Sequence, residues 1–226
     1  MIETILPSGV ASAELLDYPE DLKPHPAEEH LIANSVEKRR RDFIGARYCA
    51  RQALEQLGEP QVAIGKGERG APIWPRGVVG SLTHCDGYRA AALAHRLRYR
   101  SIGIDAEPHA TLPDGVLDSV SLPAEREWLY GTTSTGLHLD RLLFCAKEAT
   151  YKAWFPLTGR WLGFEDAHIT FTLEAAPSGA TAAGCGIFRS ELLVPGQTTD
   201  GGTPLTSFEG RWLITDGLIL TAIVHG

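Results

Sequence analysis

The sequence predicts an α+β fold built from two pseudo-symmetric α/β halves, each with a long helix packed on a small, mostly antiparallel sheet. Two observations support this prediction. Two long helical patterns stand far apart in the chain, and each is followed by a strand, an Asp-Gly turn and a second strand, with the turns at residues 86–87 and 216–217. We therefore expect an N-terminal half over residues 1–106, a C-terminal half over residues 107–226, and an active site where they meet.

The composition is that of an ordinary globular protein and excludes wholesale disorder. The 226 residues are 43% hydrophobic, and 21 basic against 28 acidic side chains give a net charge of −7, which disfavours binding to nucleic acid or to an anionic membrane. No apolar run approaches a membrane span, and Glu3 stands where a signal peptide carries bases, so we expect a cytoplasmic protein. The charge is uneven, because residues 38–100 hold 13 of the bases and only 5 of the acids.

The first long helix is expected to begin at Asn34 or Ser35, which can cap it with Glu37 as reciprocal partner, and to end before Gly58. Residues 1–33, rich in proline and acids, should form an irregular lead-in with at most short strands. Helical spacing predicts a buried face of Val36, Phe43, Ala46, Ala50, Ala53 and Leu57. Another face is basic and carries Arg39, Arg40, Arg47 and Arg51.

A glycine-rich loop and a hairpin follow this helix. Residues 65–72 contain three glycines and two cations, and they must form a loop. The apolar runs 78–83 and 88–94 flank the first Asp-Gly turn and predict an antiparallel hairpin. Residues 101–108 alternate, so that a strand closed by Pro108 would carry Asp105 and Glu107 on one face and apolar residues on the other.

The second long helix is predicted over residues 138–155, with Pro156 as its stop, after a short helix around residues 124–129. Its predicted buried face consists of Leu139, Leu142, Ala146, Ala149 and Ala153. On another of its faces Glu148 and Lys152 are four residues apart. The remainder predicts four strands, at residues 168–173, 186–194, 205–214 and 218–224.

Asp105, Glu107 and Glu148 are candidate metal ligands. Two carboxylates at positions i and i+2 of a strand point the same way, and a divalent cation would offset their repulsion. Hard oxygen ligands suit Mg²⁺, which keeps some of its waters and takes other ligands from substrate phosphates. From spacing alone, however, two surface acids on a solvated edge strand are the commoner arrangement.

Basic and hydroxyl side chains form a candidate phosphate site. His84 stands near a strand end beside two hydroxyl residues, Ser81 and Thr83. Guanidinium forks and ammonium groups suited to phosphate come from Arg39, Arg40, Arg47, Lys66 and Arg69. A magnesium site joined to such a patch would indicate a nucleotide or another polyphosphate. Taken singly, a basic helix face is usually solvated, and a lone histidine after a strand is usually structural.

Three motifs together resemble the signature of the 4′-phosphopantetheinyl transferases. They are S-x-T-H at residues 81–84, G-I-D-x-E at residues 103–107 and K-E-A-x-Y-K at residues 147–152. The chain resembles the larger, single-chain, surfactin-synthetase-activating class with two pseudo-symmetric halves. It is most similar to the actinobacterial type, because it carries F-C-A-K-E-A-T-Y-K-A-W-F-P-L-T from Phe144 and R-W-L-G-F-E-D-A-H-I-T-F from Arg160.

The resemblance implies roles for the matched residues. Those implied to hold Mg²⁺, with Mn²⁺ as a substitute, against the pyrophosphate of coenzyme A are Asp105, Glu107 and Glu148. Those implied to form the nucleotide pocket are Arg39, Arg47, Lys66, Ser81, Leu82, Thr83 and His84. Those implied to face the phosphates are Lys147 and Lys152, and those implied to line the pantetheine path are Tyr151 and Trp161. Many relatives place a polar or acidic residue at the position of Ala106, where we expect a water to complete the coordination.

The implied reaction moves phosphopantetheine from coenzyme A onto a serine of an acyl or peptidyl carrier domain. As the serine hydroxyl attacks the β-phosphate, Glu148 would take its proton directly or through a water, and Lys152 would stabilise the departing 3′,5′-ADP. The expected carriers belong to fatty-acid, polyketide and nonribosomal-peptide synthases, including those of siderophore assembly. The alternatives are a coenzyme A-binding or carrier-binding module without catalysis and a magnesium-dependent nucleotide hydrolase. A chain that contains both halves is expected to be a monomer.

Overall fold

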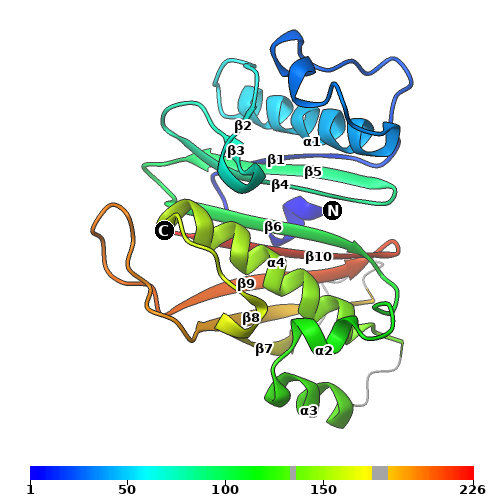
Figure 1. Cartoon of the computed structure of the whole chain (residues 1–226), viewed down its shortest axis with the longest axis vertical. Helices are drawn as coiled ribbons and strands as arrows, with labels where there is room; N and C mark the ends of the chain where they lie inside the picture. The colour runs from blue at the N-terminus through cyan, green and yellow to red at the C-terminus, as the bar shows by residue number, and fades with distance from the viewer. Residues whose placement is uncertain (133–135, 175–182) are drawn as a thin grey trace.

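Two antiparallel sheets lie side by side in the computed structural model, which describes residues 1–132, 136–174 and 183–226 (Figure 1). The first sheet has the strand order β1-β5-β4 and the second has the order β6-β10-β9-β8-β7, while β2 and β3 form a small ribbon. Helix α1 packs on the first sheet and helix α4 on the second. The predicted α+β architecture, a long helix on each of two antiparallel sheets, is therefore confirmed.

The N-terminal elements follow the predicted order. Their bounds are η1 Ile2–Ile5, β1 Val10–Leu15, η2 Pro26–Leu31, α1 Glu37–Gln56, β2 Gly65–Lys66, η3 Glu68–Gly70, β3 Pro72–Ile73, β4 Val78–Cys85 and β5 Tyr88–His95. The predicted cap of α1 is wrong, because residues 32–35 form a turn in which the Ser35 N–H donates to the Ile32 carbonyl. The helix begins one residue after Val36, whose side chain is 74% exposed and does not join the buried face.

Among the described residues, the C-terminal elements include one α-helix (α2) and one short 3-10 helix (η4) that were not predicted. Their bounds are β6 Ser101–Pro108, α2 Val116–Val120, α3 Pro123–Gly131, α4 Leu139–Thr158, η4 Phe164–Asp166, β7 Ala167–Glu174, β8 Gly184–Leu192, β9 Ser207–Thr215 and β10 Leu218–His225. Pro156 does not stop α4. A proline there removes one backbone hydrogen bond near the helix end, and the helix continues to Gly159, which adopts the left-handed conformation of a C-terminal cap (φ +64°).

Strand β6 lies wholly in the second sheet. It pairs with β10 without interruption from Ser101 to Pro108. The predicted division between residues 106 and 107 falls inside this strand, and the two sheets instead separate between β5 and β6.

Two hydroxyl side chains of β4 join the sheets to each other. The backbone N–H of Ile104 donates to Ser81 Oγ (3.1 Å), and that of Ala106 donates to Thr83 Oγ1 (2.9 Å). Both bonded pairs advance in the same direction along the chain, so β4 and β6 run parallel with side-chain hydroxyls in the place of backbone carbonyls. These hydroxyls satisfy two backbone donors on the edge of β6 that faces the first sheet.

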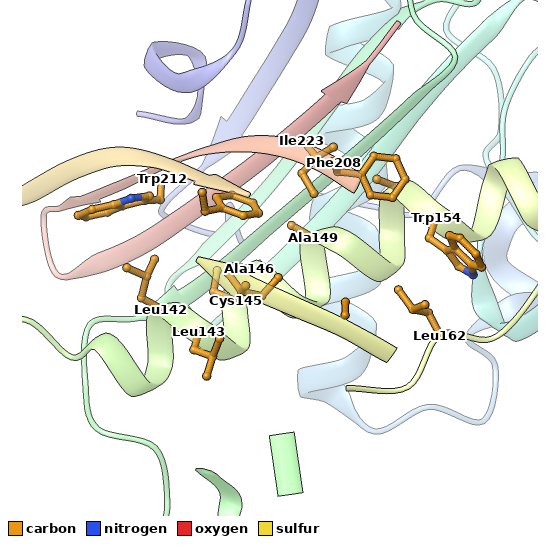
Figure 2. Close-up of a cluster of buried hydrophobic side chains, with 14 of the residues drawn as sticks. Leu142, Leu143, Cys145, Ala146, Ala149, Trp154, Leu162, Phe208, Trp212 and Ile223 are labelled. Carbon is orange, nitrogen blue, oxygen red and sulfur yellow. The ribbon is translucent and has the colours of Figure 1, made fainter. Parts of the chain in front are cut away.

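Helix α4 packs directly against β6 and the rest of the second sheet. Figure 2 shows the apolar cluster between them, with Leu142, Cys145 and Ala149 from the helix facing Phe208 and Trp212 from the sheet. Gly103 permits this packing, because a Cβ there would collide with the Ala149 carbonyl oxygen. None of the helices within the described ranges is long and apolar enough to cross a membrane.

Candidate functional site

A cavity of about 900 Å³ opens where the two sheets meet. Its walls come from α1, the β2–β3 loop, β4, β6 and α4. The predicted site residues that line it are Arg39, Arg47, Ser81, Leu82, Thr83, His84, Asp105, Glu107, Glu148, Tyr151 and Lys152. The structure thus brings together most of the predicted site, and the exceptions are Lys66, Lys147 and Trp161.

Asp105 is the central member of the cluster of three carboxylates on the cavity wall, which also includes Glu107 and Glu148. Its side chain is buried, and Oδ1 accepts hydrogen bonds from Lys152 Nζ (2.6 Å) and Thr83 Oγ1 (3.1 Å). Its other oxygen, Oδ2, is buried without a hydrogen-bond partner among the residues that the structure describes. A buried carboxylate oxygen without a partner costs free energy, which a bound cation would recover.

Two of the three carboxylates hold their protons more tightly than a free glutamate does. Burial, followed by the charge of Asp105, raises the pKa of Glu148 and of Glu107 above the ordinary value. Burial opposes the charge of Lys152, but Asp105 and Glu148 outweigh it and raise the pKa of the amine. Lys152 therefore stays charged and offsets only part of the negative charge of the three carboxylates.

The donor set fits a divalent cation, although the carboxylates are not gathered as ligands. No three side chains of ligating type within residues 1–132, 136–174 and 183–226 are arranged around one metal position. One reason is Arg141, which pairs with Glu107 (2.9 Å) and also donates to the Thr111 carbonyl (2.7 Å). The orphaned oxygen of Asp105 and the mutual repulsion of three oxygen donors nonetheless match the chemistry of Mg²⁺.

His84 and Arg39 also line the cavity. Arg39 Nη1 contacts His84 Nε2 (3.0 Å), and because a guanidinium can only donate, that nitrogen must be an acceptor. Burial lowers the pKa of His84, against the opposing charge of Asp42, which lies 3.8 Å from Nδ1. Asp42 is itself held by Arg89 (2.7 Å). Arg39 is exposed and keeps further donors for an anion.

Lys147 does not face the cavity, which corrects the prediction that it contacts phosphates. Its amine is 2.9 Å from Glu125 and donates to the carbonyls of Phe164 and Ala167 (both 2.6 Å). Both members of this ion pair are buried. Lys147 directly precedes Glu148, but a step of one residue along a helix turns the side chain by about 100°, which directs it toward α3 and β7.

Aromatic side chains form the wall that continues from Glu148 along α4. Tyr151 and Phe155 line the cavity, and the rings of Tyr151 and Trp161 are 4.9 Å apart. Trp161 is 58% exposed, and the Arg69 guanidinium lies 5.3 Å from its ring centre. Trp161 therefore extends the wall beyond the cavity. Lys66 is exposed at the end of β2, just before the segment that contributes Arg69.

Sequence reasoning missed several residues of the site. Phe144 and Phe155 line the cavity, and their spacing from Glu148 on a helix, four residues before and seven after, was the available signal. Arg141 and Asp42 act through contacts with residues 34 and 42 positions away, Glu107 and His84, and no local pattern predicts such partners.

The comparisons with known proteins agree with the motifs. Residues 27–94 match the 4′-phosphopantetheinyl transferase N-terminal domain, and residues 101–193 match the 4′-phosphopantetheinyl transferase superfamily. The two matches meet where the sheets separate.

Three relatives match over nearly their whole length. The chain is 80% identical to 4′-phosphopantetheinyl transferase Npt of Nocardia iowensis, over 100% of both chains. It is 57% identical to PptT of Mycobacterium tuberculosis, over 99% of this chain and 97% of the relative. It is 47% identical to Svp of Streptomyces mobaraensis, over 99% and 88% respectively. The chain belongs to the 4′-phosphopantetheinyl transferases of the actinobacterial type, enzymes that transfer the phosphopantetheine group to carrier proteins.

Proposed function

We propose that the cavity between the sheets is the active site, in which coenzyme A binds with its nucleotide end against Arg39 and His84 and its pantetheine arm along Tyr151 and Trp161. The observation that carries this proposal is the buried, unpartnered Oδ2 of Asp105, a residue that lines the same cavity as the basic side chains Arg39, Arg47 and His84. In this cavity, an anionic substrate and a divalent cation would neutralise each other's charge. We further propose that the protein is a cytoplasmic monomer. Its acceptors would be acyl and peptidyl carrier domains, and it would bind neither nucleic acid nor membrane.

Asp105, Glu107 and Glu148 would hold Mg²⁺ or Mn²⁺, with a water at the position beside Ala106. When bound, the cation neutralises charge on the pyrophosphate of coenzyme A. Binding through Glu107 would release this carboxylate from Arg141, while Asp105 is already oriented by Thr83 and Lys152.

Glu148 is the proposed general base. The oxygen of a carrier serine forms a bond to the β-phosphorus, the bond from that phosphorus to the bridging oxygen breaks, and 3′,5′-ADP departs. The serine proton passes to Glu148 directly or through a water, and the raised pKa of this carboxyl makes it a better acceptor than an ordinary glutamate. Lys152 stabilises the departing phosphate, whereas Lys147 has no part in this step.

The test is the mass of a carrier domain after incubation with the enzyme, Mg²⁺ and coenzyme A. We expect the carrier to gain one phosphopantetheine, and Asp105→Asn and Glu148→Gln to lower the rate by about 100-fold or more. Glu191→Gln, an exposed acid on β8, is the matched control and should retain the wild-type rate.

The other outcomes identify the alternatives. Release of 3′,5′-ADP without a change in the carrier would mean a hydrolase. Binding of coenzyme A with neither product would mean a non-catalytic module. Transfer that is unaffected by Asp105→Asn and Glu148→Gln would place the active site elsewhere.

A further inference from the structure

The N-terminal segment contains a carboxylate that is completely buried, in a region to which the sequence assigns no role. Glu28 of η2 has 0% exposure, and both of its oxygens accept from Arg51 Nη1 (2.9 and 3.2 Å). The backbone N–H of Ile64 donates to the same carboxylate at 2.7 Å. Burying a charge is costly unless it is paired and hydrogen-bonded, so this arrangement needs all of its partners.

The peptide groups of Ile64 are held from two sides. Glu28 accepts from its N–H, and Arg47 Nε donates to its carbonyl (2.8 Å), with a longer contact from Arg47 Nη2 to the Gly65 carbonyl (3.4 Å). Ile64 itself is fully buried. This residue immediately precedes β2, and the loop that follows β2, together with the start of β3, contributes residues 69–72 to the cavity lining. The base of the loop is therefore fixed by two charged side chains from η2 and α1.

Glu28 also supports the charge of Arg47, which lines the cavity. Burial lowers the pKa of this guanidinium to about 10, and the negative charge of Glu28 acts against that effect. Arg51 and Arg39 both act in the direction of lowering it further. Without Glu28, the charges of Arg39 and Arg51 would act on Arg47 with nothing from Glu28 to offset them.

We propose that Glu28 is a positioning residue for coenzyme A: it fixes Ile64 and balances Arg47 and Arg51, and so holds the β2–β3 loop and Arg47 in the geometry that receives the nucleotide end. This inference rests on the proposed function, which places the nucleotide in this part of the cavity. Glu28 does not line the cavity, so its effect on the substrate is indirect.

The test compares Glu28→Gln with Glu14→Gln. Glu14 of β1 is a matched control, because its carboxylate also accepts three hydrogen bonds (from the N-terminal amine, the Ile2 N–H at 3.0 Å and the Tyr88 hydroxyl at 2.7 Å) and lies outside the cavity lining. Both variants should lower the Tm. We expect Glu28→Gln to raise the Kd and the KM for coenzyme A about tenfold, with kcat and the KM for the carrier within about threefold of wild type.

Glu14→Gln should leave the KM for coenzyme A unchanged. The inference is overturned if Glu28→Gln binds coenzyme A as wild type does, or if the two variants change KM equally. If Glu28→Gln does not fold, Arg51→Lys, which keeps the charge but loses the fork, must raise the KM for coenzyme A in the same direction. An unchanged KM in that variant counts against the inference. Arg39→Ala separates the two proposals. An unchanged Kd for coenzyme A in this variant would contradict the proposed function. A raised Kd in Arg39→Ala, together with a wild-type Kd in Glu28→Gln, would contradict only the role of Glu28.

Discussion

The hydroxyl of Thr83 donates to Asp105 Oδ1 at 3.1 Å and accepts the Ala106 N–H at 2.9 Å, so that one side chain of the first sheet holds both the edge of the second sheet and its central carboxylate. Thr83 is buried, and β4 and β6 have no backbone pairing in the described sheets. The position of Asp105 in the cavity therefore depends on how the two sheets are joined.

Thr83→Val should lower the free energy of unfolding by about 2 kcal/mol, because it leaves the buried Ala106 N–H without its acceptor. It should also weaken Mn²⁺ binding, since Asp105 loses one of its two hydrogen bonds. Urea denaturation and titration calorimetry measure the two effects. Thr83→Ser keeps the hydroxyl and should remain close to wild type. Equal behaviour of the valine and serine variants would contradict this role.

Lys147→Met should destabilise the protein by about 3–5 kcal/mol, because Glu125 would be left as a buried charge without its cation. The double variant Lys147→Met, Glu125→Gln removes both charges and should recover much of this loss in urea denaturation. The folded double variant should keep kcat within about threefold of wild type. A loss of about 100-fold in kcat in this folded variant would mean that Lys147 does act on the phosphates, and would contradict this account.

The carboxylate cluster of the cavity should make the metal-free protein less stable as pH rises. The pKa of Glu148 is raised in the folded state, so the folded protein binds this proton more tightly than the unfolded chain, and that stabilisation is lost as pH rises through the raised pKa. Metal-free Glu148→Gln should therefore have a higher Tm than wild type at neutral pH. The difference should shrink as the pH is lowered toward the ordinary value of 4.5. A Tm difference that does not change with pH would contradict the raised pKa.

Trp161→Ala should raise the KM for coenzyme A by about threefold to tenfold, because it removes the ring that lies between Tyr151 and Arg69. The Tm should change little, since the side chain is largely exposed. Trp161→Phe retains an aromatic surface and should show a smaller increase. Steady-state kinetics at saturating carrier decides this, and an unchanged KM in Trp161→Ala would exclude the ring from the substrate path.

The local patterns predicted the elements that carry the site. Strand alternation placed Asp105 and Glu107 correctly on β6, and helical spacing placed Glu148 and Lys152 on one face of α4. The predictions failed where tertiary contacts decide the outcome. Lys147 belongs to the K-E-A-x-Y-K motif, but its amine pairs with Glu125 of α3. Pro156 remains inside a helix, because packing outweighs one lost hydrogen bond. Glu28 offered no signal, since its partners lie 23 and 36 residues away.

Titration of Mn²⁺ into the protein in the presence of coenzyme A, followed by electron paramagnetic resonance of the free ion, tests the central claim most directly. We predict that wild type and the surface variant Glu191→Gln bind the ion alike. Asp105→Asn should weaken binding by about tenfold or more, because the unpartnered carboxylate oxygen is replaced by a neutral amide or lost. Equal Mn²⁺ affinity in all three proteins would contradict the assignment of the metal, and with it the active site, to the carboxylates between the two sheets.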